Sequence, residues 1–563
     1  MTDVIVDIET DALDATVIHV ACTRVVDTDE RRTFIGDGLD HLPGYLSGYD
    51  RVIGHNALSF DIPIINRLLG GPDIPDEVVM DTLLLSQLLW PDRPGGHSLK
   101  AWGLRLKNSK IEFDDWSVPG PEMTAYCRQD VDLTHDVLTR IRQEAYAMDK
   151  PNKGTGWSRA ILTEHRVRSV MNRVEEAGYL LDVPRAAGLV AHLSIEVAEI
   201  EADVLSGAPD LPKARRRVIP KLKKDGTLSS VGLRHLDDIS TCGGEHTVIE
   251  WVPFNLSSRQ QIAQRLIREG WKPRRRTEHG QPIVDETTLS SLDIPLAKKI
   301  ARYLLLQKRV TQINSWIEKV HPDGRVRSGY RTLGAITHRM SCVTPNLQQV
   351  PGPQSEYGPE CRECWTVAPG RTLIDDKDYT EELINGDVHT RTQRLAGLPT
   401  RAGAKTFTYA LLYGAGDAKL GTIVGGGAAE GRAIRQRYLR GMPSFDHLQR
   451  RITRESGSGH IRGIDDRMLR VRSEHAALNT LLQSCAAVVA KLWLVRVHEH
   501  LPAGAFIVAM IHDELCIETD SSVSPEHIGQ ISKDAIQHVA GVLDFNCPLD
   551  CDWTVGDNWS ETH

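Results

Sequence analysis

The sequence predicts a multidomain protein in which an α/β module precedes a larger α+β region. Its 563 residues allow three to five domains at roughly 100–200 residues each. Residues 1–145 alternate between strand-like and helix-like patterns, whereas the chain from residue 157 onward is mostly helical. The Pro-, Gly- and Lys-containing segment 148–156 (MDKPNKGTG) lies between the two regions and is expected to be a linker.

The composition is that of an ordinary globular protein, with 40% hydrophobic residues, 25% charged residues and a formal net charge of −8. It excludes disordered, collagen-like and disulfide-scaffold classes. No apolar run reaches the roughly 18 residues of a membrane span, and the acids within MTDVIVDIET exclude a secretory signal. Ten irregularly spaced cysteines indicate reduced thiols and a cytoplasmic location. Zinc at the Cys361/Cys364 pair is the weaker alternative.

The order of elements is predicted from periodicity and turn residues. Strands are expected at VIVDIE (4–9) and TVIHVACTRVV (16–26). The expected helical segments are 77–90, 121–145, 186–206, 257–269, 285–319 and 399–450. Segment 321–370 is rich in turns, and the last seventy residues hold one buried strand with acids at its end, a helix and a Trp-bearing tail.

Segment 208–252, rich in Pro, Gly and basic residues, is expected to be a long insertion or loop. Its cations are Lys213, Arg215, Arg216, Arg217, Lys221, Lys223 and Lys224. A second cluster lies at 274–276. Each cluster is either a solvated surface or a contact to a phosphate backbone, and the sequence leaves both interpretations open.

Four carboxylates in the first module form a candidate metal site. Asp7 and Glu9 are two residues apart on a predicted strand, so both point to one face. Asp61 lies in HNALSFDIP, and Asp130 lies on a predicted helix with Tyr126 one turn earlier. Each acid alone is more often a surface residue. Together they offer the oxygen ligands that a pair of Mg²⁺ ions requires.

In this order the acids resemble the DEDD superfamily of 3′–5′ exonucleases, which carries a DxE strand, an Asn-x4-Asp segment and a YxxxD helix. The corresponding residues are Asp7 with Glu9, Asn56 to Asp61, and Tyr126 to Asp130. The resemblance implies an RNase H-like exonuclease domain over residues 1–147, acting on single-stranded DNA 3′ ends. It also implies that the four acids hold two metal ions and that Tyr126 orients the attacking water.

A second constellation recurs every four residues in RAGAKTFTYALLYGAG: Arg401, Lys405, Tyr409 and Tyr413. This spacing places two cations and two aromatic rings along one helical stripe, suited to phosphates and a base or sugar. The alternative from periodicity is an amphipathic helix with basic residues at one end and aromatic residues in the core.

This segment resembles the O-helix motif RxxxKxxxYxxxYG of family A DNA polymerases. The resemblance implies that Arg401 and Lys405 bind the triphosphate, that Tyr409 stacks near the sugar and that Tyr413 closes the pocket. His389, in NGDVHT, matches a further phosphate-contacting position. The implied fold is a right hand over residues 157–563. Its parts are a thumb at about 185–320, a palm at about 321–384 and 451–563, and fingers at about 385–450.

A third constellation interrupts the hydrophobic segment AFIVAMIHDELCIE (505–518) with His512, Asp513 and Glu514. A plain hairpin turn explains the acids but is unusual inside such an apolar run. The segment resembles the VHDE palm hairpin of family A polymerases. The resemblance implies that Asp513 binds metal, that Glu514 supports it and that His512 contacts the primer end.

Supporting segments extend the resemblance to nearly the whole chain and to phage replicative polymerases. AITHRMSCVTPNLQQVPG (335–352) matches TGRxSSxxPNLQxxP, with Arg339 as the DNA-binding arginine. His338 replaces a glycine there, and glycine tolerates positive φ. Asn479 and Gln483 match residues that contact the primer-template minor groove. Some relatives carry a thumb loop for a processivity factor at the position of 208–252.

One motif is missing. The palm sequence DxSxxELR is absent from PGRTLIDDKDYTEELINGDVHT (369–390), and DYTEEL (378–383) has the wrong spacing and no arginine. One explanation is a deletion between Ile374 and Asp375 that removes a metal-binding aspartate and the helix after it. The other is that Asp375 or Asp376 takes over the metal role.

The expected function is therefore phage-type DNA replication by a template-directed DNA polymerase with a proofreading 3′–5′ exonuclease. It uses primer-template DNA, dNTPs and two Mg²⁺ ions per active site, with Mn²⁺ as a substitute. The alternative is a polymerase-impaired family member that acts as an exonuclease or a primer-template binding protein. An RNA-processing exonuclease shares only the first domain, and the later motifs argue against it.

Overall fold

The computed structural model describes residues 2–116, 118–150, 154–219, 223–227, 245–378 and 388–563. The chain forms two compact units. One comprises Met1–Leu181 with Lys319–His563, and the other comprises Asp182–Glu318. The second unit falls close to the segment expected as the thumb, and that assignment stays a prediction.

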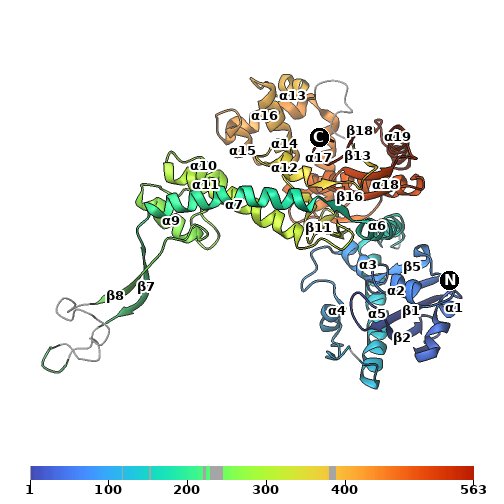
Figure 1. Ribbon diagram of the computed structural model, residues 1–563. Helices are drawn as coiled ribbons and strands as arrows, with labels where there is room; N and C mark the ends of the chain where they lie inside the picture. Colours follow the sequence, from blue (N-terminus) through green and yellow to red (C-terminus); the bar gives the residue numbers. More distant parts are fainter. Residues whose placement is uncertain (1, 117, 151–153, 220–222, 228–244, 379–387) are drawn as a thin grey trace. The chain divides into compact units, whose positions relative to one another are not determined.

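The amino-terminal module, which carries the labels β1, β2 and β5 in Figure 1, is built on a five-stranded mixed sheet in the order β3-β2-β1-β4-β5. The strands are β1 (Asp3–Thr10), β2 (Ile18–Val25), β3 (Arg31–Ile35), β4 (Arg51–Gly54) and β5 (Val79–Asp81). β1 pairs antiparallel with β2 and parallel with β4. The strands expected at 4–9 and 16–26 are confirmed, and β1 is buried along most of its length because it is the central strand.

Five helices belong to this module: α1 (Leu42–Leu46), α2 (Asp61–Leu68), α3 (Thr82–Leu89), α4 (Leu99–Leu106) and α5 (Pro121–Met148). The helix expected at 121–145 is confirmed as α5. The helix expected at 77–90 begins later, because 79–81 pairs with β4 as a strand. The Asp81 side chain then accepts a hydrogen bond from the backbone N–H of Leu83 and caps α3.

The carboxyl-terminal part of the same unit contains an antiparallel sheet, called here the palm-like sheet, in the order β16-β17-β13-β18. Its strands are β16 (Ala505–Ile511), β17 (Glu514–Asp520), β13 (Arg371–Asp378) and β18 (Cys551–Gly556). The hairpin that the resemblance implies at 505–518 is present, because a two-residue turn at 512–513 reverses the chain between β16 and β17. Helix α19 (Pro525–Val542) packs against β13 and β18.

Helix α18 (Ala477–His500) packs on α19 and on α6 (Ser158–Ala177). Together with the residues before it, 474–500 is long and apolar enough to cross a membrane by length and composition alone. Of its most apolar 18 residues, 61% are buried inside the protein, as in the core helix of a globular domain.

Short strands connect α6 to the palm-like sheet. β6 (Tyr179–Leu181) lies between β12 (Trp365–Thr366) and β9 (Arg325–Val326), and β10 (Gly329–Arg331) pairs with β11 (Ser341–Val343). The expectation of a turn-rich segment at 321–370 is confirmed by these short elements and by α12 (Gly358–Glu363).

The expected helical segment 399–450 is confirmed and has a core of its own. Its helices are α14 (Arg401–Leu412), α15 (Asp417–Thr422), α16 (Ala428–Gly441) and α17 (Pro443–Ser456), preceded by α13 (Val388–Ala396). Ala404, Phe407 and Leu411 of α14 are buried in that core, so the opposite face of α14 points outward. After α17, β14 (His460–Arg462) and β15 (Met468–Arg470) form a hairpin that leads into α18.

The second unit is built on the long helices α7 (Val183–Ser206) and α11 (Pro295–Ile317), which pack against each other. Helices α9 (Arg259–Arg268) and α10 (Glu286–Ser290) complete it. The expected helices at 186–206, 257–269 and 285–319 are therefore confirmed. The side chain of Ser258 caps α9 by accepting from the backbone N–H of Gln261.

The expectation of a loop at 208–252 was wrong for its two ends. β7 (Leu211–Val218) and β8 (His246–Val252) form an antiparallel ribbon. Arg215 pairs with Glu250, and Arg217 pairs with Glu245. Cross-strand pairs of opposite charge favour such a ribbon. The sequence did not indicate these pairs, because the acidic partners lie far along the chain from the run of basic residues.

The last residues of the chain contact the palm-like sheet. His563 Nδ1 lies 3.0 Å from Asp375 Oδ2, and His563 Nε2 lies 3.3 Å from Glu514 Oε2. Thr562 Oγ1 donates to Asp375 Oδ2 at 3.1 Å, and Trp559 Nε1 donates to Glu514 Oε1 at 2.6 Å. Burial disfavours protonated His563, but the bonds to Asp375 and Glu514 outweigh it and raise its pKa.

We expect His563→Ala to lower the thermal unfolding midpoint, because it removes one partner of a buried ion pair, a loss of about 3–5 kcal/mol in well-buried cases. Since the pKa of His563 is raised on folding, its contribution is complete below the ordinary histidine pKa of about 6.5 and is lost as pH rises through the folded value.

The measurement is the difference in unfolding midpoint between the variant and the unaltered chain across a pH series. His527→Ala, at an exposed histidine, is the control. An unfolding difference that is the same for both variants, or that grows with pH, would contradict the expectation.

Candidate active sites

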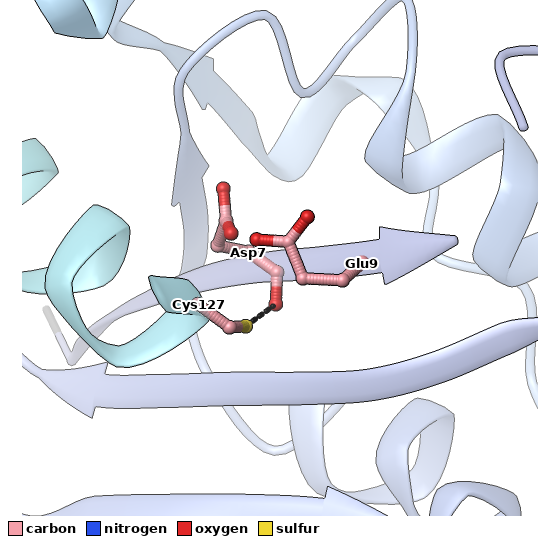
Figure 2. A group of neighbouring side chains, drawn as sticks. All are labelled: Asp7, Glu9 and Cys127. Atoms are coloured by element: carbon pink, nitrogen blue, oxygen red, sulfur yellow. Dashed lines mark hydrogen bonds between the residues drawn. The ribbon is translucent and has the colours of Figure 1, made fainter. Parts of the chain in front are cut away.

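The four carboxylates predicted from the sequence come together at the central strand of the first sheet. Asp7 and Glu9 project from β1 (Figure 2), Asp61 is the first residue of α2, and Asp130 lies on α5. Asp61 Oδ1 accepts from the backbone N–H of Ile8 at 3.1 Å, which ties α2 to β1 between the two acids.

The site concentrates negative charge in a buried place. Burial, followed by repulsion from Asp130, raises the pKa of Glu9 to about 8. Burial also raises the pKa of Asp61 to about 7 and holds that of Asp7 well above its usual value, with further contributions to the latter from Asp130, Glu9 and Asp61. Glu9 Oε1 and Asp130 Oδ1 are buried without a hydrogen-bond partner among the described residues. Oxygen-only ligands, mutual repulsion and unpartnered oxygens fit divalent cations.

Lys110 is a member of this site that no sequence motif indicated. Its ammonium bonds Asp130 Oδ2 and lies 4.2 Å from the centre of the Tyr126 ring. Phe113 and Trp116 pack against the same ring, with centroids 5.7 and 5.4 Å from it. Lys110 is on a loop and belongs to no sequence motif, so only the three-dimensional structure identifies it as part of this site.

Cys127 is a second such member. Its Sγ donates to the backbone carbonyl of Asp7 at 3.3 Å, as the dashed line in Figure 2 shows. Ligand atoms of Cys127, Asp7 and Glu9 lie within 4.8 Å of one another. The contact holds α5 against β1 and thereby fixes Asp130, one turn away, relative to the two strand acids.

Helix α14 carries the second predicted set on its outward face. Arg401, Lys405 and Tyr413 are exposed, and Tyr409 is half-buried. The Tyr409 and Tyr413 rings stack with centroids 6.5 Å apart, and Lys405 Nζ lies 6.0 Å from the Tyr409 ring centre. The alternative that placed these aromatic residues in the core is wrong, because Phe407 and Leu411 occupy it. His389 lies on α13, but its side chain is outside the described part of the chain.

The predicted His512–Asp513–Glu514 set lies at the turn between β16 and β17. His512 has a φ of 63°, and both His512 and Asp513 are exposed, whereas Glu514 is buried. Although both side chains reach the surface, the surrounding protein removes part of their hydration, which raises the pKa of Asp513 and lowers that of His512, and the nearby Arg339 guanidinium lowers both.

A cavity of 180 Å³ adjoins this turn, and its polar lining residues are Arg339, Gln348, Lys491, His512 and Asp513. Asn479 and Gln483 lie on α18, and Gln483 Nε2 donates to Asn479 Oδ1 at 3.0 Å. His338, which stands where the resembling family has glycine, has a φ of 61°, so this position does require the left-handed backbone region.

Asp375 and Asp376, the two acids expected as possible metal ligands, contact residues away from the turn at 512–513. Asp375 is fully buried and bonds Thr562 and His563. Asp376 is also fully buried, and burial raises its pKa to about 7, with Ser532 and Cys551 as its neighbours. Neither residue lines the cavity beside Asp513.

Strand register points to a different acid. β13 pairs with β17 through Lys377 opposite Glu514, and β13 ends at Asp378. Asp378 follows the Lys377–Glu514 pair by one residue and is itself paired with Cys551 on β18, so among the acids of β13 it is the one next to the end of the strand that lies beside the turn. Asp378 was not among the predicted ligands, because DYTEEL has the wrong spacing for the family motif.

The cysteine pairs show no metal site of their own within the described ranges. Cys361, Cys364 and Cys551 are buried cysteines outside any disulfide, and Cys547 is exposed. In that part of the chain, ligand atoms gather only in Asp7–Glu9–Cys127 and in Asp375–Glu514–Cys516. The CxxC pair therefore acts in the structure as buried thiols.

Comparison with known proteins identifies the family. The profile of DNA polymerase family A matches residues 238–384 and 380–561, so the chain belongs to DNA polymerase family A. Enzymes of this family use divalent metal ions. The chain is 29% identical to the DNA-directed DNA polymerase of Escherichia phage T7 over 100% of both chains, and 29% identical to that of Enterobacteria phage T3 over 94% of each.

The fold also matches a solved structure, the POL domain of Pol1 from M. smegmatis in complex with a DNA primer-template and dNTP. The TM-score is 0.76 at 16% identity, covering 100% of this chain and 96% of that one. The alignment with the T7 enzyme spans 704 positions against 563 residues here, so this chain carries long gaps. The family profile also splits at 380–384, beside the missing motif.

We expect added Mn²⁺ or Mg²⁺ to raise the thermal unfolding midpoint more at about pH 9 than at about pH 6, because cations bind the ionised carboxylates. Without metal, the raised pKa values of Glu9 and Asp61 mean that their contribution to stability is present below about pH 4 and is lost as pH rises through about 7 and about 8.

The measurement is thermal unfolding with metal and with a chelator at both pH values. In Asp7→Asn with Glu9→Gln, the pH-dependent part of the metal effect should disappear. A metal effect that is equal at both pH values, or that survives in this variant, would count against a carboxylate metal site here.

Proposed function

We propose that this family A polymerase extends primer-template DNA with dNTPs and that its amino-terminal module is a 3′–5′ exonuclease. The main support for the exonuclease assignment is the set of buried, mutually repelling carboxylates, two of whose oxygens have no hydrogen-bond partner among the described residues. The main support for nucleotide binding is the row of cationic and aromatic side chains on the outward face of α14. The relatives from phages T7 and T3 support a role in phage DNA replication, which would place the protein in the cytoplasm of a bacterial host.

In the exonuclease module, Asp7, Glu9, Asp61 and Asp130 would hold two Mg²⁺ ions, which Mn²⁺ can replace. When bound, such a pair stabilises the attacking and leaving oxygens of phosphodiester cleavage. The Tyr126 hydroxyl would orient the attacking water. Lys110, which already bonds Asp130, would keep this acid oriented and offset part of the negative charge as the DNA phosphate enters.

In the polymerase module, Arg401 and Lys405 would hold the triphosphate, because both are exposed cations on one face of α14. Tyr409 and Tyr413 would stack near the sugar and close the pocket, and His389 would contact a phosphate. Arg339, Asn479, Gln483 and His512 would hold the primer-template. The primer 3′ hydroxyl attacks the α-phosphate and releases pyrophosphate.

The metal-binding pair of this second site would be Asp513 with Asp378. Asp513 is exposed at the turn, and Asp378 ends β13 one residue beyond the pair that Lys377 forms with Glu514. Asp375 and Asp376 are poorer candidates than the sequence suggested, because the former is bonded by His563 and the latter lies under α19. Glu514, bonded by Trp559 and His563, would support the turn from below.

The second candidate function is a polymerase-impaired member that acts as an exonuclease or binds primer-template. The split family match favours it, because the break at 380–384 lies beside the segment that lacks the metal-binding motif. The sheet order is nevertheless intact, with β13 between β17 and β18. For this reason we place the active polymerase first.

The thumb insertion would bind a processivity factor. The ribbon of β7 and β8 exposes Trp251 and Ile249, at 60% and 46% of their surface. A two-stranded ribbon with apolar residues exposed is marginal in water by itself. Its exposed cations suit the DNA backbone as well, so a partner protein and the duplex are both compatible with its chemistry.

We expect Asp7→Ala with Glu9→Ala to reduce degradation of single-stranded DNA at least about a thousandfold, since losing metal ligands removes several kcal/mol of transition-state stabilisation. The assay measures release of nucleotides from a 3′-labelled strand with Mg²⁺. Asp14→Ala, at an acid with a 99% exposed side chain, is the matched control and should degrade DNA normally. Unreduced degradation by the double variant would refute the exonuclease assignment.

We expect Asp378→Asn to abolish primer extension and Asp375→Asn to leave it measurable, with lower thermal stability. Extension is measured in the Asp7→Ala, Glu9→Ala background, so that degradation of the primer does not mask it.

Three outcomes separate the alternatives. Extension lost only in Asp378→Asn supports the Asp378–Asp513 pair. Extension lost only in Asp375→Asn or Asp376→Asn assigns the metal to that residue instead. Absence of extension in the unaltered chain, with primer-template still bound, establishes the impaired member.

A further inference from the structure

A buried ion network lies beneath the cavity that adjoins Asp513. Its side chains are at most 1% exposed and come from α6, from the segment between β14 and β15, and from α18. Its charged members are Glu164, Asp465, Arg467 and Lys491. None of them belongs to a motif found in the sequence.

The contacts in this network are dense. Lys491 Nζ bonds both carboxylate oxygens of Glu164 at 2.8 and 2.6 Å, and Arg467 Nη1 lies 2.8 Å from Glu164 Oε1. Arg467 also donates to Asp465 from Nε at 2.8 Å and from Nη2 at 2.7 Å. Two acids and two bases make the network electrically neutral. Because desolvation offsets much of the attraction in buried ion pairs, their best-attested use is to fix one arrangement of the elements that they join.

The network ends on His338. Arg467 Nη1 lies 3.0 Å from His338 Nδ1, so Nδ1 accepts and the ring proton is on Nε2. Burial, followed by the charges of Arg467 and Lys491, lowers the pKa of His338 well below its ordinary value, and the ring is therefore neutral.

His338 is costly at this position for two reasons. Its φ of 61° is unfavourable for a residue with a side chain, and its Nε2 is buried without a hydrogen-bond partner among the described residues. Strained residues of this kind persist only where the surroundings determine them, and they gather at functional sites. The next residue is Arg339, which is exposed and lines the cavity with His512 and Asp513.

We propose that His338 is a positioning residue: Arg467 clamps its imidazole, and this clamp sets the backbone direction from which Arg339 reaches a primer-template. The inference rests on the proposed DNA-binding role of Arg339. It assigns the buried network a purpose beyond stability, because the network is the anchor that holds Arg467 still. It also explains why a histidine occupies a position whose backbone conformation favours glycine.

The test compares two substitutions that both tolerate positive φ. His338→Gly keeps the backbone conformation accessible but removes the acceptor, and we expect primer-template affinity to fall about tenfold. His338→Asn keeps a side-chain oxygen that can accept from Arg467, and we expect affinity within about twofold of the unaltered chain. Affinity is measured by fluorescence anisotropy with a labelled primer-template and a chelator present.

Two further measurements separate positioning from folding. Degradation of single-stranded DNA, which uses none of these residues, and the thermal unfolding midpoint report whether each variant is folded. If His338→Gly does not fold, Arg467→Lys gives the same test, because lysine keeps the charge opposite Glu164 and Asp465 but lacks the guanidinium fork that also reaches His338. We expect Arg467→Lys to weaken primer-template binding about tenfold as well.

Arg339→Ala separates the DNA contact of Arg339 from the positioning role of His338. If Arg339→Ala weakens binding and the folded His338→Gly variant does not, the positioning role is overturned while the DNA contact of Arg339 stands. If Arg339→Ala leaves binding unchanged, the DNA contact and the positioning role are both wrong. Weak binding in His338→Gly and Arg339→Ala, with recovery in His338→Asn, supports the inference.

Discussion

Pairing buried carboxylates with cations is the constraint on which both candidate sites depend. At the first site Asp7, Glu9, Asp61 and Asp130 repel one another, and Lys110 offsets them through its bond to Asp130. In the palm-like sheet the buried acids Asp375 and Glu514 are instead balanced from within the chain, by His563. An ionised acid in a buried place is stable only with such a partner. Lys110 bonds one acid of the first set, whereas His563 contacts both acids of the second.

Much of this organisation could be predicted from the sequence, because the signals were local. The two-residue spacing of Asp7 and Glu9 predicted one strand face, and the four-residue stripe from Arg401 to Tyr413 predicted one helix face. The glycine-like backbone at His338 was indicated by a single mismatch with a family motif. Local periodicity is reliable where the backbone alone decides which residues share a face.

The parts that could not be predicted depend on contacts between distant segments. Lys110 meets Asp130 across 20 residues of sequence, and the bases of β7 find their acidic partners on and beside β8 after a long insertion. His563 reaches Asp375 from the end of the chain, and no spacing rule connects them. The helix expected at 77–90 gave way at its start to a strand, because pairing with β4 outweighed helical periodicity.

The strand beside the missing palm motif shows how a sheet fixes register. A strand in the middle of a sheet is held by ladders on both sides, so both neighbours constrain which of its residues face them. β13 keeps its pairing with β17 and β18 up to its last residues. In this register Asp375 and Asp376 pair with Cys516 and Leu515, away from the turn, and Asp378 is the next residue after Lys377, which faces Glu514. Because alternate residues on a strand point to opposite faces, a change of one residue in register would move both buried acids, Asp375 and Asp376, to the opposite faces of the sheet.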